Sequence, residues 1–366
     1  MFFWLTLVSL FTLSAAGPSS ASSNCIGEIS SLSDVNSAVN CATVNINSFT
    51  VPAGETFSLN LLDGTTVNVK GNIQFGNKTW SGPLFNVQST FALVNGNGYK
   101  WDGGGPYYWD GGGLEDGVTK PVVMMNIIIS GKLSNMDVIN SPAHAFHFFS
   151  QGTLTVSGVT VDNSRGDKPN SKSKGEPAGR NTDGINLNGD NFTVENCYIY
   201  NQDDCIAIKT GSNILVRGNY CSGSHGISIG GIMTGNVVSG VTISGNTITN
   251  GKLGLRIKTD DDAKYGTVTD VVFKDNIADR ISMFGVLISQ SYPSDLGTPN
   301  NRVTISNISF TGGLTKIATK NNAYMAAVNC GEGSCTGTWD WSSLTTSGGK
   351  VGPYKNCDLI TGFEQY

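Results

Sequence analysis

The chain has 366 residues, of which 39% are hydrophobic and only 14% are charged, against roughly 25% charged residues in an ordinary soluble domain. Its 47 glycines, together with many Asn, Ser and Thr residues, exclude a coiled coil and a charged disordered chain and argue against a helical bundle. A net charge of −5 argues against nucleic acid as a partner. The core must therefore be built from short β-segments joined by many turns.

The first 16 residues are mostly apolar and carry no charge. The run is too short for a transmembrane helix, which needs about 20 residues, and small residues follow it, with Ala16 and Ala21 as candidate cleavage sites. We interpret residues 1–22 as a secretory signal peptide and residues 23–366 as one mature domain. The alternative is a buried first strand or helix. We therefore expect a secreted, extracellular protein that does not associate with membranes.

The eight cysteines match no zinc-binding spacing and fit disulfides formed in an oxidising compartment. Their closest neighbours in the sequence predict three local disulfides, Cys25–Cys41, Cys205–Cys221 and Cys330–Cys335. Cys197 and Cys357 are left over and either bond each other or stay free. Three sequons permit N-glycosylation of a secreted protein, at Asn77, Asn191 and Asn307.

Segments that alternate apolar and polar residues, and then meet Asn, Gly or Asp, recur along the chain. They begin at Ser134, Ser157, Phe192, Ile214, Val241, Val271 and Val303. The last four steps are 22, 27, 30 and 32 residues. Strand-like repeats of this length predict an all-β solenoid, a single-domain parallel β-helix, in which Asn-rich turns form stacked amide ladders. An antiparallel β-sandwich is the alternative, but it does not explain a repeat that runs in one direction.

Three ionisable residues follow the same period, because Asp183, Asp204 and His225 are each 21 residues apart. Stacked coils would place them about 4.8 Å apart on one face. Like charges at that distance raise at least one carboxyl pKa and keep a proton on one member, as a general acid beside a general base requires. Asp203 can reach the same cleft as Asp204 only if the backbone bends between them. The alternative is a set of Asp turns that cap strands or bind calcium.

Arg256 and Lys258 share one face of a predicted strand, and Tyr292 follows further along. Arg grips a carboxylate through two hydrogen bonds and Lys acts as a point charge, so the pair suits an anionic ligand. The alternative is two solvated side chains. A group of aromatic residues suits either stacking on sugars or, as we favour, packing in the early coils: Trp80, Trp101, Trp109, Tyr107 and Tyr108.

Four short blocks occur in a fixed order: Asn181–Gly184 (NTDG), Gln202–Cys205 (QDDC), Ser224–Gly226 (SHG) and Arg256–Lys258 (RIK). Together they resemble the signature blocks of glycoside hydrolase family 28, the polygalacturonases, and are most similar to the fungal-type endo-acting enzymes. The resemblance covers most of the mature chain. It implies a right-handed parallel β-helix and hydrolysis of α-1,4 bonds between galacturonic acid units, with inversion at the anomeric carbon.

The resemblance also implies the catalytic roles. Asp203 would protonate the leaving glycosidic oxygen, Asp183 and Asp204 would hold and activate the attacking water, and His225 would keep the protons of the aspartates in order. Inversion follows from the resemblance alone, since carboxylates one coil apart would favour retention, and inversion normally needs a separation of roughly 6.5–9.5 Å.

Arg256, Lys258, Tyr292 and Asn181 would bind substrate by the same resemblance. We expect a pectic polysaccharide as the partner, a monomer, and neither a cofactor nor a metal. The alternatives are a pectin-binding homologue without catalysis, a rhamnogalacturonan or xylogalacturonan hydrolase, a pectate lyase, or a structural solenoid.

Three departures from the family pattern stand out. Ser224 replaces the usual Gly before His225, and Asn186 replaces an Asp found in many relatives. The polar insert Arg165–Arg180 is long and carries five cations against two acids. We hypothesise that this insert borders the cleft and helps to bind the polyanionic substrate.

Overall fold

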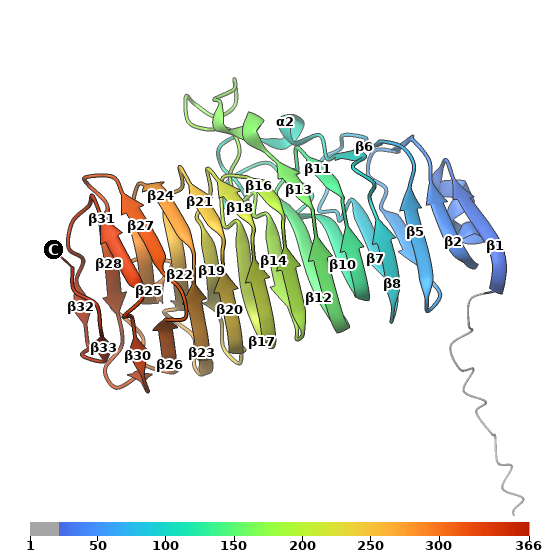
Figure 1. Ribbon diagram of the computed structural model, residues 1–366. Helices are drawn as coiled ribbons and strands as arrows, with labels where there is room; N and C mark the ends of the chain where they lie inside the picture. Colours follow the sequence, from blue (N-terminus) through green and yellow to red (C-terminus); the bar gives the residue numbers. More distant parts are fainter. Residues whose placement is uncertain (1–21, 366) are drawn as a thin grey trace, which may run out of the picture.

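The chain forms a parallel β-helix, as predicted (Figure 1). This computed structural model describes residues 22–365. Strands pair in parallel throughout this range, so the antiparallel sandwich is excluded. The predicted signal peptide lies outside the described residues except for Ser22, and it stays a prediction. Within the described range, no helix is both long and apolar enough to cross a membrane.

The strands fall into three sheets. The largest contains β1 (Ser22–Ile29), β2 (Cys41–Ile46), β4 (Phe57–Asn60), β5 (Thr65–Val69), β7 (Phe85–Gln88), β8 (Ala92–Asn95), β10 (Val123–Ser134), β12 (His144–Ser157), β14 (Ile185–Asn188), β15 (Phe192–Glu195), β17 (Ile206–Arg217), β19 (Ile227–Ile232), β20 (Val237–Ser244), β22 (Leu253–Asp260), β23 (Gly266–Lys274), β25 (Phe284–Tyr292), β26 (Val303–Phe310), β28 (Tyr324–Asn329), β29 (Cys335–Thr336) and β32 (Tyr354–Lys355).

The second sheet contains β3 (Phe49–Val51), β6 (Ile73–Phe75), β9 (Lys100–Asp102), β11 (Asp137–Ile139), β13 (Thr160–Asp162), β16 (Tyr198–Tyr200), β18 (Tyr220–Ser222), β21 (Thr247–Thr249), β24 (Ile277–Ile281), β27 (Thr315–Thr319) and β31 (Leu344–Ser347). The third contains β30 (Trp339–Asp340) and β33 (Ile360–Thr361). Four short helices are η1 (Leu32–Asp34), α1 (Val35–Ala38), α2 (Gly105–Tyr108) and η2 (Ser164–Asp167).

Long strands turn the corners of the helix. β10 pairs with β7 through its first half and with β8 through its second half, and the register shifts between Ile129 and Gly131. β17 turns at Gly211, whose φ is 122° and where a Cβ would lie 1.8 Å from the carbonyl oxygen of Gly189. Only glycine fits that left-handed, crowded position, so glycine in these strands marks the corners of the coil.

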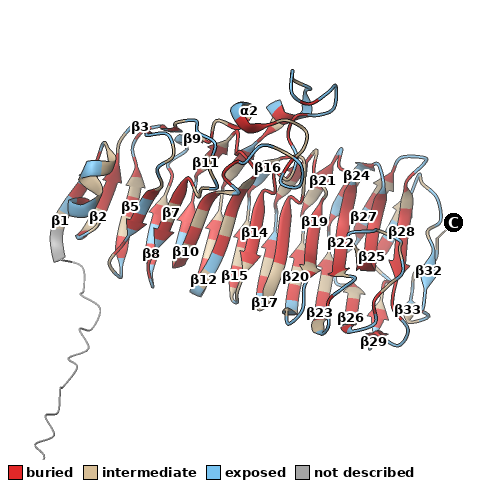
Figure 2. Ribbon diagram, turned by 180° about the vertical axis from the view of Figure 1, so that it is seen from behind, coloured by how far each residue is buried: buried red, intermediate tan, exposed pale blue. Residues whose placement is uncertain are grey.

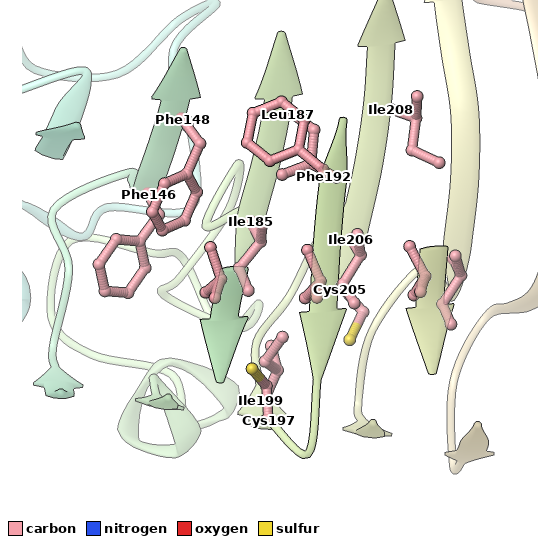
Figure 3. Packing of buried hydrophobic residues seen from close by; sticks show 14 of the residues in the cluster. Phe146, Phe148, Ile185, Leu187, Phe192, Cys197, Ile199, Cys205, Ile206 and Ile208 are labelled. Atoms are coloured by element: carbon pink, nitrogen blue, oxygen red, sulfur yellow. The ribbon is translucent and has the colours of Figure 1, made fainter. Parts of the chain in front are cut away.

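The interior is an apolar column made of stacked rows. Ile185 pairs with Ile206, and Ile206 with Ile227, on successive strands, and all three are fully buried. Figure 3 shows this packing, with Ile185 beside Ile206 and the rings of Phe146 and Phe148 in the coil before Ile185. No single coil could bury its apolar side chains alone, so stacking supplies the core, visible as the continuous buried stripes of Figure 2.

The early aromatic residues are mostly structural, as we favoured. Trp101, Tyr108 and Trp109 are buried, and Trp80 packs against the core. Tyr107 alone among these five is exposed, at 44%.

A ladder of buried amides runs beside the apolar column, as predicted. The side chain of Asn219 donates to Asn246, and that of Asn246 donates to Asn276, both over 3.0 Å. The backbone N–H of Cys197 donates to the Asn219 side chain, so Cys197 occupies the ladder position one coil earlier. Cys197 and Cys357 are both buried and do not bond each other.

The repeat register is as predicted from Phe192 to Val271, because Ile214 pairs with Val241, and Val241 with Val271. The last step is wrong. Val271 pairs with Ile308 rather than with Val303, so the step is 37 residues instead of 32. The strand β26 contains two similar alternating stretches, and sequence pattern alone does not say which of them continues the row.

The three predicted disulfides are present: Cys25–Cys41, Cys205–Cys221 and Cys330–Cys335. Two of the sequon asparagines, Asn77 and Asn307, are exposed, and Asn191 is half-buried. The Asn307 amide already donates to Asp270, which leaves Asn77 as the more accessible acceptor. Glycosylation stays a prediction.

Candidate active site

A groove of about 650 Å³ crosses the middle coils. Its floor and rim include Asn181, Asp203, His225, Arg256, Lys258 and Tyr292. Asp183 and Asp204 lie beneath it and are almost fully buried. The six predicted residues that line the groove come from coils far apart in sequence, and the helical stacking brings them together.

Strand register explains the 21-residue period. Asp183, Asp204 and His225 each stand two residues before a strand, β14, β17 and β19 respectively. These strands pair in register, and the backbone N–H of Gly184 donates to the carbonyl of Asp204. The predicted ladder therefore arises from backbone pairing between successive coils, and one ionisable residue precedes each of three successive strands.

The backbone bends at Asp203, as the cleft requires. The side-chain amide of Asn201 donates to the carbonyls of Thr182, Asp203 and Asp204, at 2.9, 3.1 and 2.9 Å. The Asp203 carboxylate accepts the backbone N–H of Asp204 at 2.8 Å. These bonds hold both carboxylates on the groove side, although neighbours in a straight strand point to opposite faces. Asn201 was not among the predicted site residues.

Asp204 is neutralised by a buried lysine. The Lys258 ammonium donates to one carboxylate oxygen at 2.6 Å, and the Ser228 hydroxyl donates to the other at 2.7 Å. Burial by itself would raise the pKa of Asp204, but Lys258, with smaller help from Lys209 and Arg256, holds it below its ordinary value. Asp204 is therefore an ionised acceptor that can hold a water molecule.

Asp183 retains its proton more readily than an ordinary carboxyl group. Burial raises its pKa, the charges of Asp203 and Asp204 raise it further, and His144 lowers it in part. One carboxyl of the ladder, Asp183, thus has a raised pKa, but burial contributes more to it than the predicted crowding by like charges. The side-chain amide of Asn186, which replaces the family Asp, donates to Asp183 at 3.2 Å.

Asp203 has the opposite electrostatics. Burial alone would raise its pKa, but hydrogen bonding to His225 and the charges of His225 and Lys258 bring the pKa well below the ordinary value. His225 Nδ1 lies 3.2 Å from the carboxylate, and the side-chain amide of Asn181 donates to it at 3.2 Å. Asn181 therefore lines the groove, but its side-chain amide is already hydrogen-bonded to Asp203.

Two further histidines belong to the same cluster. His144 Nε2 lies 3.6 Å from the Asp183 carboxylate, and its Nδ1 lies 2.7 Å from His147 Nε2. Burial first, then the neighbouring His144 and Lys209, lowers the pKa of His147 to about 3, so this ring is neutral. The chain has three histidines in all: His144 and His225 contact the aspartates, and His147 contacts His144. That scarcity was the signal that sequence reasoning overlooked.

The two predicted substrate cations are already paired within the protein. Lys258 binds Asp204, and a guanidinium nitrogen of Arg256 donates to Asp295 at 2.6 Å. Both cations lie over the ring of Tyr292, at 5.4 Å for Arg256 and 4.9 Å for Lys258. Tyr292 thus packs where the resemblance implied. Lys252, which was not predicted, also lines the groove, and its ammonium contacts no described residue.

The insert borders the groove with both of its acids and with one of its five cations. Asp167, Glu176 and Arg180 line the groove, where Arg180 pairs with Glu115 at 2.8 Å. Arg165 and Lys168 face a separate hollow near α2, and Lys172 donates to the carbonyl of Tyr107. The predicted placement of the insert at the cleft is confirmed, and its part in binding the polyanionic substrate stays a prediction. Figure 1 shows the insert as the green loop that projects beside α2.

Three side chains, those of Asp203, Asp204 and His225, each bring one ligand atom within 4.8 Å of the others, the minimum arrangement for a metal ion. A cation bound there would stand beside the Lys258 ammonium, which already neutralises Asp204. The donor set therefore fits an internal ion-pair network better than a metal site.

Comparison with known proteins decides the family. The model of the glycosyl hydrolases family 28 matches residues 41–364. The chain belongs to this family. It is 34% identical over 321 residues to endopolygalacturonase I of Aspergillus aculeatus, a match that covers 86% of this chain and 82% of the relative. It is 37% identical over 322 residues to endopolygalacturonase A of Aspergillus flavus, with 85% and 84% covered.

Solved structures agree. Endopolygalacturonase I from Stereum purpureum, complexed with two galacturonate molecules, is 43% identical with a TM-score of 0.86, covering 91% of this chain and 98% of that one. The endo-xylogalacturonan hydrolase from Aspergillus tubingensis has a TM-score of 0.67 at 21% identity, covering 93% and 99%. At that identity the second match supports the β-helix fold alone.

Proposed function

We propose that this family 28 glycoside hydrolase is a secreted, monomeric endopolygalacturonase that cleaves α-1,4 bonds inside pectic polygalacturonate, with inversion at the anomeric carbon. The observation that carries the proposal is one groove in which Asp203 and His225 face solvent, Asp183 and Asp204 lie directly beneath, and Arg256, Lys258 and Lys252 supply positive charge. The names of the relatives, endopolygalacturonases from Aspergillus and Stereum, support the same substrate.

Asp203 is the proposed general acid because, of the three aspartates Asp183, Asp203 and Asp204, it is the one that lines the groove and can touch a glycosidic oxygen. It gives its proton to the leaving oxygen as the bond to the anomeric carbon breaks. A water molecule held by Asp183 and Asp204 attacks that carbon from the other side and loses one proton to Asp204, the ionised member of the two. His225, at 3.2 Å from Asp203, then returns the protons to their starting places.

The free protein holds Asp203 ionised, so substrate binding has to supply its acidity. In the free groove, hydrogen bonding from His225 and the charge of Lys258 keep the pKa of Asp203 low. A bound galacturonate adds negative charge beside Asp203. It also pairs with Lys258 and Arg256, which then stabilise the ionised form of Asp203 less. Both effects raise the pKa of Asp203, so protonation of the acid is coupled to occupation of the groove.

The test is timed sizing of the products released from polygalacturonic acid, together with an assay for reducing ends. Endo-action predicts mixed oligomers early in the reaction. Asp203→Asn removes the acid and keeps the shape, so the rate should fall by roughly 10²- to 10⁴-fold while the thermal midpoint changes little. Wild-type activity in that variant would remove the acid assignment.

Proton NMR of the first sugar anomer released tests inversion, since retention would yield the opposite anomer. Binding of polygalacturonate without new reducing ends would favour a non-catalytic pectin-binding protein. Unsaturated products that absorb ultraviolet light would identify a lyase. Hydrolysis confined to xylogalacturonan or rhamnogalacturonan would redirect the substrate assignment.

A further inference from the structure

The carboxylate of Asp295 occupies the place at Arg256 where a ligand carboxylate would bind. One Asp295 oxygen lies 2.6 Å from a terminal nitrogen of the Arg256 guanidinium, and both residues line the groove. The Arg256 side chain is only 5% exposed, whereas that of Asp295 is 26% exposed. The arginine is therefore fixed in the wall, and its partner stands at the rim where it can be displaced.

The loop that carries Asp295 is held in place. The Ser291 hydroxyl donates to the carbonyl of Ser294 at 2.8 Å and accepts the backbone N–H of Gly297 at 3.0 Å. The side-chain amide of Asn329 donates to the carbonyl of Gly297 at 3.0 Å. These bonds hold the backbone on both sides of Asp295, so the fold places this residue beside Arg256.

Arg256 still has donors to offer. Its Nε is buried and has no hydrogen-bond partner within the described structure. A buried guanidinium nitrogen without an acceptor is costly, and a carbonyl or carboxyl oxygen of a ligand would relieve that cost. The subsite thus offers Arg256 as a hydrogen-bond donor whose positive charge is already balanced by Asp295.

We propose that Asp295 sets the charge specificity of this subsite, so that it accepts methyl-esterified galacturonate as well as the free acid. This inference rests on the proposed pectin-cleaving function. An unpaired arginine would favour a free carboxylate strongly, because it attracts the anion through charge as well as hydrogen bonds. When Arg256 is paired with Asp295, it can donate hydrogen bonds to the uncharged carbonyl of an ester. A free carboxylate has to displace Asp295 from Arg256 or bind Arg256 together with it.

The second cation of the groove provides the contrast. Lys258 is also paired, but its partner Asp204 is 1% exposed and belongs to the proposed catalytic set. That pair cannot open without leaving a charge buried, whereas the Arg256–Asp295 pair can. Of the two cations Arg256 and Lys258, only Arg256 can therefore select charge by exchanging partners.

The test is the selectivity ratio, kcat/KM on unesterified polygalacturonic acid divided by kcat/KM on highly methyl-esterified pectin of matched chain length. Asp295→Asn keeps the shape and removes the resident charge, so the ratio should rise about fivefold, the size expected for one partly exposed ion pair. Asp295→Glu should return the ratio to near the wild-type value. Asp279→Asn, which breaks the ion pair with Arg280 outside the groove, should leave it unchanged.

An unchanged or lower ratio in Asp295→Asn, with a wild-type thermal midpoint, would overturn the inference, as would an equal rise in Asp279→Asn. If Asp295→Asn folds poorly, the ratio measured for Asp295→Glu against Asp295→Ala decides between charge and shape. The failure of the proposed function would look different, because the wild-type protein would then release no reducing ends from polygalacturonic acid.

Discussion

Two neighbouring rows of the same strands have opposite compositions. The inward row consists of aliphatic residues in register, Ile185, Ile206, Ile227, Leu255, Val286 and Ala326. The adjoining outward row, one residue along, is Asn186, Ala207, Ser228, Arg256, Leu287 and Ala327. Both rows use the same backbone spacing, yet the first is uniform and the second changes in character at almost every coil.

The difference arises from what each row contacts. An inward side chain contacts its equivalents in the coils above and below, so each coil must supply a similar shape. The outward side chains of this row are buried as well, but their partners differ from coil to coil: Ser228 donates to Asp204, Arg256 pairs with Asp295, and Leu287 packs in a small apolar cluster. Adjacent residues of one strand therefore have different roles: the inward residue stabilises the fold, and the outward residue can take part in the site. Substitutions in the two rows should have separable effects.

The largest effect should come from breaking the buried ion pair on the outward side. Lys258→Met leaves the Asp204 carboxylate buried without its cation, so reducing-end release should fall by roughly 10²-fold or more and the free energy of unfolding by about 3–5 kcal/mol. The double variant Asp204→Asn with Lys258→Met has no unpaired charge and should regain most of that stability but not the activity. A double variant no more stable than Lys258→Met would contradict this account.

A cavity in the inward row should lower the free energy of unfolding and leave the rate of substrate cleavage unchanged. Ile206→Ala removes three carbons from a fully buried position and should lower the free energy of unfolding by about 2–5 kcal/mol, read from the denaturant midpoint. Ile277→Ala, at a position 49% exposed on β24, is the matched control and should change it by less than about 0.5 kcal/mol. Equal losses in the two variants would show that the inward row has no special place in the core.

The pH dependence of stability should identify Asp183 as the carboxyl group that resists ionisation. Its folded-state pKa is raised, mainly by burial, so its favourable contribution is complete below the ordinary carboxyl pKa and is lost as pH rises through the raised value. Asp183→Asn cannot ionise. Its thermal midpoint relative to wild type should therefore climb between pH 3 and pH 7, by roughly 2–4 °C, although activity is lost.

Asp63→Asn, an exposed position, is the control for that experiment and should track the wild type across the same pH range. A flat difference between Asp183→Asn and wild type would show that Asp183 ionises normally in the folded protein.

The smallest effect separates the groove lysine from the cations of the insert. Lys252 lines the groove with an ammonium that no described residue pairs, so Lys252→Ala should raise KM for polygalacturonate about fivefold. Lys168 and Lys174 do not line it, so the double change to Ala should alter KM by less than about twofold. A larger effect in the double variant would show that these two lysines belong to the binding surface.

Much of the fold was predictable because stacking imposes a repeating pattern on the sequence. The alternating segments from Phe192 to Val271, and the Asn that recurs in each turn, predict the correct row register and the amide ladder. The error at Val303 arose because β26 alternates twice, and only contact with the preceding coil selects Ile308 for the row. The repeat length can be read from the sequence alone, but which residue of a strand continues a row depends on contact with the neighbouring strand.

The candidate site divides in the same way. The 21-residue spacing is enough to place Asp183, Asp204 and His225 at the starts of three successive strands. Nothing in the sequence pairs Asp295 with Arg256, or assigns to Asn201 the bend at Asp203, because those contacts join loops whose paths are not periodic.

The order of residues alone was enough to specify the solenoid, the three disulfides and the ionisable residues that precede three successive strands, because each depends on local pattern or on a short separation along the chain. Which charges are paired and which face the groove became fixed only when the coils stacked and the loops folded over them. Ion pairing depends on distances of a few ångströms between coils and loops, and packing sets those distances.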